Sequence, residues 1–397
     1  MLVLSPSIVL SAAEAGYVAY DVRLDRLYRL NPTAALILEL CDGTRDRDGL
    51  RTDLEPVVGG GWQGWLDWID TALNDRLVID LAEASAEGTA DAQASGAGLD
   101  AAALARHADD LQHRDRVLAA FVCQERAAEL APSAPDVLLR LGELAHIVGR
   151  RETARQAYQR YLAERPDDAE VAHLVTALTD AAAPPRVSDR CIEQLYSRFA
   201  AFYDENMTGE LEYCAPDRLY DAVSRALAVG GEPGCLAALD VLDLGCGTGL
   251  SGGRWRPLAA RLIGIDLSPE MIAHARARGV YDSLETAEIT GWLSRQRADR
   301  FDLILACDSL IYFGNLTQVL GPAARRLEPG GLIGFTVERG DTHPFQLSDS
   351  GRFTHHRDHI AEAANAAGLT ILSLGESIVR YEYGDPVHGL IAVCQGS

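Results

Sequence analysis

The spacing of hydrophobic positions changes twice along the chain and divides it into three segments. Up to about residue 81, short apolar runs of strand length precede stretches with apolar residues at helical spacing. From about Asp100 to Thr179 the spacing is helical throughout, and from Ser188 to Ser397 short apolar strands alternate with amphipathic helices. A stretch rich in Ala, Gly and Ser and a second one containing Ala-Ala-Ala-Pro-Pro separate the three segments. We therefore expect domains at 1–81, 100–184 and 185–397, with a flexible linker at 82–99.

The first segment predicts a small sheet followed by three helices. We expect strands at Ser7–Leu10, Tyr17–Asp21, Leu27–Leu30 and, as a wing, Arg76–Ile79, and helices at Pro32–Leu40, Asp46–Glu55 and Trp62–Leu73. Asn31 followed by Pro32 is typical of a helix start, because Asn can accept a hydrogen bond from a free N–H group and Pro needs none. This order of elements is a winged-helix-like layout.

Within this layout, the stretch Leu30–Gly43 (LNPTAALILELCDG) resembles the PqqD family, the precursor-peptide recognition domains of ribosomal-peptide pathways. In that family a leader peptide adds as a strand beside the third strand and packs against the third helix. The resemblance implies a leader-binding surface made of Leu27, Tyr28, Arg29, Trp65, Trp68 and Ile69. The alternative interpretation is that the tryptophans fill the core of this small domain.

The second segment is similar to tetratricopeptide repeats. With Pro166 at the closing position of a frame of about 34 residues, Leu141 and Gly142 fall at first-helix contact positions and Tyr158 at a second-helix position. A degenerate repeat precedes this one, and a capping helix that begins at Ala169 would follow it. We favour a rigid spacer for this array over a concave peptide-binding surface, because two repeats make a shallow groove.

The third segment predicts a doubly wound, mostly parallel α/β sheet, with strands at Leu239–Leu244, Arg261–Ile265, Phe301–Ala306 and Leu332–Val337. The first strand leads into Gly245-Cys246-Gly247-Thr248-Gly249, where missing Cβ atoms let a ligand lie against the backbone. Leu250 stands where a dinucleotide fingerprint has its last glycine. Asp243, just before the loop, would repel a pyrophosphate but suits a cationic ligand. Asp266 ends the next strand, where it can accept both hydroxyls of a ribose.

These features are similar to those of class I S-adenosylmethionine-dependent methyltransferases, and the likeness covers most of the third segment. It implies S-adenosylmethionine as the cofactor, with Leu267 and Met271 packed on the adenine and Glu288 at a position where the family more often has Asp. The cofactor-binding residues that it implies are Asp243, Gly245, Gly247, Gly249, Asp266, Leu267, Met271, Glu288 and Asp308. Within the family, the chain resembles the predicted methyltransferases that carry tetratricopeptide repeats, in the stretches Phe199–Asp204, Val280–Asp282, Ser350–Phe353 and Arg380–Glu382.

Methyl transfer from a sulfonium is an in-line displacement, so holding the acceptor close and in line can supply much of the catalysis. A protein base is needed only if the acceptor loses its proton in that step. Candidate acceptor-side residues are Tyr196, Phe199, Tyr203, Asp308, Tyr312, His343, His355 and His356, of which we favour Tyr203, Asp308 and His355 as catalytic. His355 is the preferred base because imidazole titrates near neutrality and the family has His at the matching position. The alternatives are a surface histidine in a mobile loop and, for Asp308, a helix N-cap.

Composition narrows the range of partners. Among 397 residues, 58 are acidic and 36 are basic, all of the latter Arg, for a net charge of −22. This acidity argues against a nucleic-acid substrate, as does Asp308-Ser309-Leu310-Ile311 where enzymes that methylate exocyclic amines carry Asn/Asp-Pro-Pro-Tyr/Phe. The 8 cysteines form no CxxC pair, which argues against a metal site and for reduced thiols. We find no secretory signal and no apolar run of roughly 18 residues, so we expect a cytoplasmic protein without a membrane span.

Together these features favour a methyltransferase of a ribosomal natural-product pathway. The first segment would capture the leader of a precursor peptide, and the last would methylate its core, with tethering raising the local concentration of the acceptor. One alternative is a small-molecule methyltransferase whose front domains serve regulation or oligomerisation, and another is a non-catalytic scaffold that senses S-adenosylmethionine. Assembly as a homo-oligomer is compatible with each of them.

Overall fold

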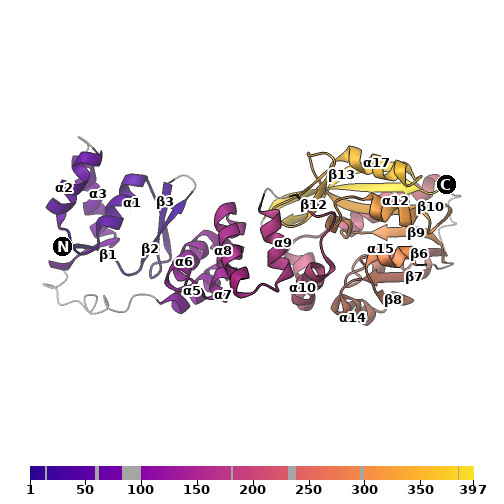
Figure 1. The fold of residues 1–397 in the computed structure, drawn as a ribbon, viewed down its shortest axis with the longest axis horizontal. Coiled ribbons are helices and arrows are strands. Elements are labelled where there is room, and N and C mark those ends of the chain that lie inside the picture. The colour runs from indigo at the N-terminus through magenta and orange to yellow at the C-terminus, as the bar shows by residue number, and fades with distance from the viewer. Residues whose placement is uncertain are drawn as a thin grey trace. The chain divides into compact units, whose positions relative to one another are not determined.

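The computed structural model describes residues 1–13, 16–58, 62–82, 100–179, 182–230, 238–295, 299–382 and 384–397. The chain forms two compact units, Met1–Arg165 and Pro166–Ser397 (Figure 1). The predicted linker at 82–99 lies, apart from residue 82, outside the described residues. The boundary between the units precedes the helix at Ala169, which the repeat pattern had placed at the end of the second segment.

The first unit begins with two small sheets and three helices, in the predicted order except for the first strand, β1, which was not predicted. The strands are β1 (Leu2–Leu4), β2 (Ile8–Ala13), β3 (Gly16–Asp21), β4 (Arg26–Leu30) and β5 (Val78–Asp80). The helices are α1 (Pro32–Leu40), α2 (Arg47–Val58) and α3 (Trp62–Asn74). The middle strands pair antiparallel in the order β2-β3-β4, whereas the expected wing, β5, pairs with β1. Asn31 caps α1 by accepting a hydrogen bond from the N–H of Ala34 at 2.8 Å.

Four helices follow, arranged as two helical hairpins. They are α5 (Ala101–His113), α6 (Val117–Leu130), α7 (Pro135–Ile147) and α8 (Arg151–Glu164). Helices α7 and α8 touch where the repeat frame predicts: a Cβ on Gly142 would lie 2.3 Å from the ring of Tyr158. Only glycine therefore allows the two helices to approach this closely.

The sheet β2-β3-β4 packs on the first helical hairpin, so the first predicted segment and the second one up to Arg165 form one compact unit. Ser11 on β2 donates a hydrogen bond to Glu125 on α6. The Tyr20 ring on β3 stacks on His107 of α5 at 6.0 Å between centroids, and Arg116 pairs with Asp25 at 2.9 Å. Removing residues 1–81 would therefore expose the surface of α5 and α6 that these residues cover.

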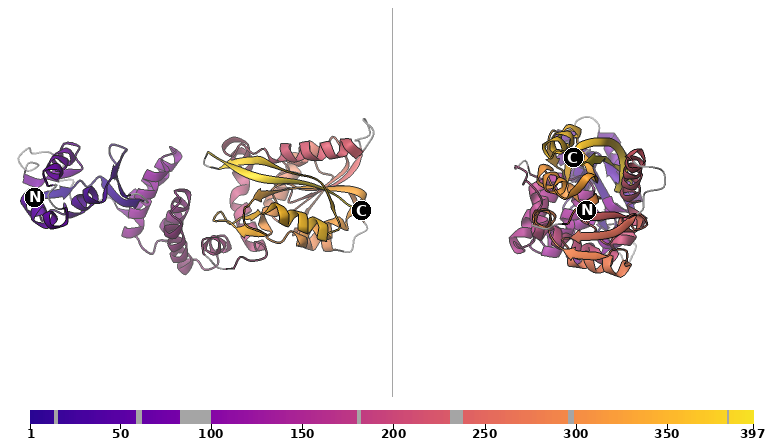
Figure 2. Two further views of the ribbon diagram at one scale, coloured as in Figure 1. Left: turned by 90° about the horizontal axis from the view of Figure 1, so that it is seen from above. Right: turned by 90° about the vertical axis from the view of Figure 1, so that its right-hand side faces the viewer.

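The second unit is an α/β fold around a large mixed sheet, as expected for the third segment. Its strands are β6 (Leu239–Leu244), β7 (Ala259–Asp266), β8 (Ser283–Thr286), β9 (Phe301–Ala306), β10 (Leu327–Arg339), β11 (Phe345–Leu347), β12 (Phe353–His355), β13 (Thr370–Glu382) and β14 (Asp385–Gln395). The order is β11-β12-β10-β9-β6-β7-β8, with β14 pairing with both β10 and β13. Strands β8, β7, β6, β9 and β10 run parallel, and β14 runs antiparallel to β10. The long β13–β14 pair forms the yellow end of the colour range in Figure 2.

Helices flank this sheet and precede it. They are α9 (Ala169–Ala177), α10 (Asp189–Phe199), α11 (Tyr203–Glu205), α12 (Ala215–Gly230), α13 (Gly252–Trp255), α14 (Pro269–Arg278), α15 (Ile289–Ser294), α16 (Thr317–Ala324) and α17 (Arg357–Ala366). Short helical turns occur at η4 (Ala200–Phe202), η5 (Asn206–Glu210) and η6 (Leu310–Tyr312). Helix α9 packs against α10, and His173 on α9 bonds the carbonyl of Gly351 at 2.8 Å, which ties this helix to the second unit.

Residues of each central strand alternate between two hydrophobic cores, one on each face of the sheet. On β6, Val241 joins the core formed with α12, whereas Leu242 and Leu244 join the core formed with α15, α16 and α17. On β9, Leu303 and Ile304 divide in the same way. This explains why the strands read as nearly continuous apolar runs, since both of their faces are buried.

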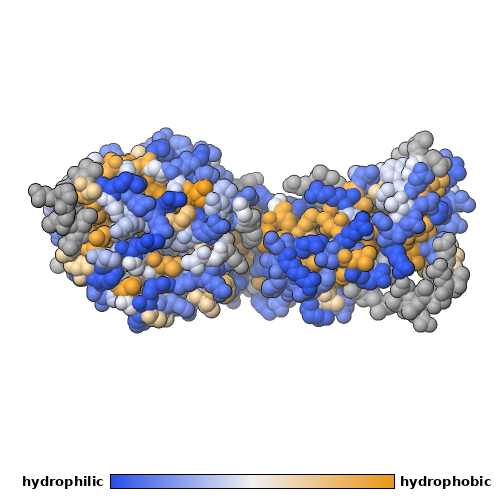
Figure 3. Space-filling model, turned by 180° about the vertical axis from the view of Figure 1, so that it is seen from behind, coloured by the Kyte–Doolittle hydropathy of each residue, from blue (hydrophilic) through white to orange (hydrophobic). Residues whose placement is uncertain are grey.

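The surface is largely polar. On the face shown in Figure 3, hydrophilic residues cover much of each unit, with apolar residues between them. Among the described residues, no helix combines the length and the apolar character needed to cross a membrane.

Candidate functional site

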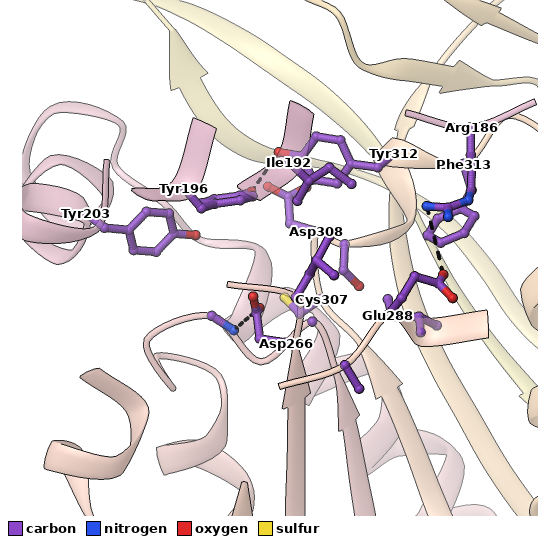
Figure 4. Close-up of a pocket in the computed structure, with 16 residues that line it drawn as sticks. Arg186, Ile192, Tyr196, Tyr203, Asp266, Glu288, Cys307, Asp308, Tyr312 and Phe313 are labelled. Atoms are coloured by element: carbon purple, nitrogen blue, oxygen red, sulfur yellow. Dashed lines mark hydrogen bonds and ion pairs between the residues drawn. The ribbon is translucent and has the colours of Figure 1, made fainter. Parts of the chain in front are cut away.

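A pocket lies at the carboxyl ends of β6, β7 and β9, where these parallel strands end at the same edge of the sheet (Figure 4). The space in and in front of this pocket, open solvent included, is about 620 Å³. Ligands of doubly wound sheets commonly bind at this edge. Its lining residues are Arg186, Ile192, Tyr196, Tyr203, Gly245, Gly247, Asp266, Leu267, Ala287, Glu288, Ile289, Cys307, Asp308, Ser309, Tyr312 and Phe313.

The glycine loop after β6 forms one wall of the pocket, and its three glycines differ in what surrounds them. Gly245 has φ +71°, and a Cβ there would lie 2.5 Å from the Cβ of Ser309. Gly247 has φ +53°, and a Cβ would meet no atom within 4 Å, so its backbone faces open space. Gly249 instead makes room for Tyr281, 3.0 Å from its Cβ position, and is outside the lining. The loop therefore offers bare backbone to a ligand chiefly at Gly247.

Asp266 stands at the end of β7 with its carboxylate fixed by the backbone. Its Oδ2 accepts from the N–H of Gly247 at 2.9 Å, and its Oδ1 accepts from the N–H of Ser268 at 2.9 Å. Burial raises the pKa of Asp266, and these backbone donors oppose that rise. The neighbouring Leu267 lines the pocket as predicted, whereas Met271 is 1% exposed within α14 and outside the lining. Asp266 is thus held in position with lone pairs left for further hydrogen bonds.

Asp243 is placed behind the glycine loop and outside the pocket lining. It is 1% exposed, its Oδ2 accepts from the Tyr281 hydroxyl at 2.8 Å, and its Oδ1 is buried without a hydrogen-bond partner. Burial, and to a smaller degree the charge of Asp266, raise the pKa of Asp243 to about 7 although Tyr281 opposes this. The expected direct contact of Asp243 with the cofactor is therefore not seen in the pocket lining; its carboxylate is held by Tyr281.

Glu288 lines the end of the pocket that lies away from Tyr203 (Figure 4), and it also caps α15. Its carboxylate accepts from the N–H groups of Thr290 at 2.9 Å and Gly291 at 2.6 Å. Arg186 lies 4.0 Å from it and is, among the described residues, the only one of the lining with a positive side chain. Sequence reasoning missed Arg186, which reaches the pocket because Arg186 bridges to Phe313 and Val187 donates to the carbonyl of Tyr312 at 2.9 Å.

Aromatic side chains line the part of the pocket near α10 and η6. The hydroxyls of Tyr196 and Tyr312 lie 2.6 Å apart, and the ring centroids of Tyr196 and Tyr203 lie 6.1 Å apart. Tyr203 extends from α11 toward the pocket (Figure 4). Asp204, next to it, is bonded by Thr248 of the glycine loop and by Arg278 of α14. These two hydrogen bonds hold the segment that carries Tyr203 against the glycine loop and α14.

Asp308 follows β9 at the inner end of the pocket, in the left-handed conformation with φ 56°. Its N–H donates to Thr336 Oγ1 at 2.8 Å, and its carboxylate lies 3.0 Å from Arg380. Burial raises the pKa of Asp308, and the charge of Arg380 opposes this. The structure thus brings Asp308 and Tyr203 together at one pocket.

His355 lies elsewhere. It is fully buried in β12, its Nε2 is 2.8 Å from the carbonyl of Phe313, and its ring stacks on His359 at 5.9 Å. Burial lowers the pKa of His355 to about 4. Neither the expected base at the acceptor nor the alternative of a surface histidine in a mobile loop fits this position, because pairing of β12 with β10 carries His355 into the interior, away from the pocket lining.

The residues expected to bind a leader peptide differ in exposure. Leu27, Tyr28 and Arg29 lie on β4, an edge strand that pairs with β3 on one side and with no strand of the described residues on the other. Trp65 and Trp68 are partly buried against the core, whereas Ile69 is 1% exposed inside it. The side chain of Ile69 is therefore unavailable to a bound peptide.

Comparisons with known proteins agree on the second unit. Residues 241–331 match the family model described as a methyltransferase domain. A ubiquinone biosynthesis O-methyltransferase of Xanthomonas oryzae pv. oryzae is 31% identical over 147 residues, covering 34% of this chain and 62% of that protein. Methyltransferase-like protein 27 of Homo sapiens is 30% identical over 149 residues, covering 37% and 58%. The chain thus spans less than two thirds of the length of these curated relatives.

Similar solved structures are distant. The magnesium protoporphyrin IX methyltransferase of Synechocystis PCC 6803, with bound S-adenosylmethionine, has 16% identity and a TM-score of 0.40 over 55% of this chain and 100% of that one. The N-methyltransferase NodS of Bradyrhizobium japonicum, in complex with S-adenosylhomocysteine, has 21% identity and a TM-score of 0.40 over 51% and 97%.

Proposed function

We propose that this protein, whose residues 241–331 belong to a methyltransferase domain of the kind that uses S-adenosylmethionine, methylates a ribosomally synthesised precursor peptide. The observation that carries the methyltransferase activity is the pocket at the strand ends, where the bare backbone of Gly247 and the fixed carboxylate of Asp266 meet. The proposal that the acceptor is a peptide is supported by separate features, which lie in the first unit.

The pocket fits S-adenosylmethionine in shape and charge. The space beside Gly247 would be filled by any Cβ placed there, so a ligand can lie against that backbone. The described residues of the lining include the carboxyl groups of Asp266, Glu288 and Asp308 against one guanidinium, that of Arg186. This excess of negative charge favours a sulfonium cation.

Three of the lining residues would hold the cofactor. Asp266 accepts hydrogen bonds from ribose hydroxyls through the lone pairs that Gly247 and Ser268 leave free. Leu267 and Ile289 offer apolar contact to the adenine. When bound, S-adenosylmethionine supplies a methyl group that leaves with ease, since its departure neutralises the sulfonium. The chain itself contributes position and exclusion of water.

Two features of the first unit support a peptide acceptor. The outer edge of β4 offers main-chain hydrogen bonds to an added strand. Trp65 and Trp68 are partly exposed, and aromatic side chains of this kind are enriched where proteins bind peptides. A leader held there raises the local concentration of the core at the methylating pocket.

The test uses the full chain, because the sheet of the first unit covers part of the helical hairpins. Methylation is measured by mass spectrometry on any precursor-like peptide that is found encoded beside this gene and on the same peptide without its leader. We expect faster turnover with the leader, and slower turnover with Trp68→Ala than with Leu130→Ala, an exposed apolar control on α6. Equal rates on the two peptides would refute leader capture. Loss of S-adenosylhomocysteine binding in Asp266→Ala, measured by calorimetry, tests the cofactor site separately.

A small-molecule acceptor is the second candidate, favoured by the relatives named as ubiquinone biosynthesis O-methyltransferases. The rings of Tyr196, Tyr203, Tyr312 and Phe313 would suit an aromatic acceptor of this kind. Methylation of a free aromatic compound at rates unaffected by a peptide would favour this candidate. Tight cofactor binding without any methylated product would instead favour a sensing scaffold.

A further inference from the structure

Asp308, at the inner end of the pocket, belongs to a group of five charged side chains, of which Arg380 and Glu338 are buried and the other three are partly buried. Arg380 on β13, 3% exposed, contacts Asp308 at 3.0 and 3.3 Å and also bonds Glu338 and Glu382, the last at 2.7 Å. Arg352 contacts Glu338 at 2.6 Å and Glu382 at 2.5 Å. Three carboxylates thus meet two guanidinium groups, and the group carries one net negative charge.

The arrangement fixes Asp308 at the pocket and withholds both arginines from it. A residue other than glycine with φ 56° is strained, and such strain persists only where surrounding contacts hold it. Here Thr336 holds the N–H of Asp308, and Arg380 holds its carboxylate. Because Arg380 is already engaged by three carboxylates and Arg352 by two, neither can turn to pair with a bound anion.

We propose that this pocket takes an acceptor whose reacting group is an amine or a hydroxyl, received by the Asp308 carboxylate, and that it rejects carboxylate acceptors. The proposal rests on the methyltransferase function proposed above. The Asp308 carboxylate accepts the hydrogen bond of the acceptor's N–H or O–H. The proton that nitrogen or oxygen loses when it gains the methyl group passes to that carboxylate. Tyr203 and Tyr312 face Asp308 from α11 and η6 and are neutral, since burial raises the pKa of both.

The size of the discrimination follows from the charges. Two like charges about 4 Å apart in a partly exposed site repel one another enough to weaken binding by roughly a hundredfold to a thousandfold. Water and salt reduce this where the pocket is open, so at least about a tenfold difference should remain. Arg186, the one cation that the described part of the chain contributes to the lining, is engaged by Asp189 at 2.5 Å and by Glu288.

The experiment compares three probes of one shape on the full chain saturated with S-adenosylhomocysteine: benzylamine, benzyl alcohol and benzoate. Binding is followed by NMR titration in wild type, in Asp308→Asn, and in Glu193→Gln, which removes an exposed charge on α10 as a matched control. We expect benzoate to bind at least about tenfold more weakly than the amine and the alcohol in wild type and in Glu193→Gln. In Asp308→Asn that gap should close.

Each other outcome overturns a defined claim. Benzoate binding as tightly as the other two probes, a gap that survives in Asp308→Asn, or no binding by any probe would overturn the acceptor assignment. Failure of the wild-type chain to bind S-adenosylhomocysteine, measured first by calorimetry, would overturn the proposed methyltransferase function itself. The two failures are therefore distinguishable.

Discussion

Replacing Arg380 by Met tests the ion group at the base of the pocket most directly. The substitution keeps an unbranched apolar stem but leaves Asp308, Glu338 and Glu382 with Arg352 alone. Removing one partner from a buried ion pair leaves uncompensated charge and costs about 3–5 kcal/mol. Side chains here are 3% exposed for Arg380 and 8% for Glu338, so solvent can do little to relieve that cost.

The measurement is calorimetric unfolding, in which the transition of the second unit is identified because S-adenosylhomocysteine raises it. For a unit of this size the expected loss corresponds to a fall in melting temperature of roughly 6–20 °C. The matched control is Arg254→Met, whose partner Asp217 is 51% exposed, and it should shift the transition little because exposed pairs contribute about 0–1 kcal/mol.

The pH dependence has a definite sign. Burial already raises the pKa of Asp308 while Arg380 opposes it, so removing Arg380 raises that pKa further. An acid whose folded pKa lies above its unfolded value destabilises the fold at high pH, and the penalty is relieved as pH falls through the folded pKa. The deficit of Arg380→Met should therefore be larger at about pH 8 than at about pH 5. A deficit no larger than that of Arg254→Met, or one that grows on acidification, would refute the reasoning.

Two further substitutions have equally specific outcomes. Gly247→Ala should weaken S-adenosylhomocysteine binding in calorimetry far more than the control Gly279→Ala does. Both substitutions strain a left-handed backbone by about 1–2 kcal/mol, but of these two positions only Gly247 faces the pocket. Equal affinities of the two variants would contradict a ligand beside Gly247. Asp243, with its pKa raised to about 7 chiefly by burial, should cost the fold up to about 4 kcal/mol as pH rises from about 4 to about 7. Urea unfolding of Asp243→Asn should lack that part of the pH slope, and an unchanged slope would show that Asp243 does not titrate there.

The local pattern of the chain determined its elements and the outline of the cofactor site. Apolar spacing predicted strands that match β2, β3, β4 and β5 in the first unit and β6, β7, β9 and β10 in the second, but it did not predict β1 or the strands β11 to β14. Asn31 with Pro32 marked the start of α1. Glycine spacing after β6 and the position of Asp266 after β7 predicted side chains at one edge, because parallel strands end together. These patterns involve residues that are close in sequence, so they can be recognised without the structure.

Contacts between distant residues were decided only by the tertiary structure. Arg380 lies 72 positions after Asp308 and reaches it because β14 pairs with both β10 and β13. Pairing of β12 with β10 buried His355, and a separate bridge to Phe313 brought Arg186 to the pocket. Periodicity tells which face of an element is buried, whereas the partner that the face meets depends on strand order and register. For that reason the sequence could predict the type of cofactor site, whereas the charged residues around the proposed acceptor position could be identified only from the fold.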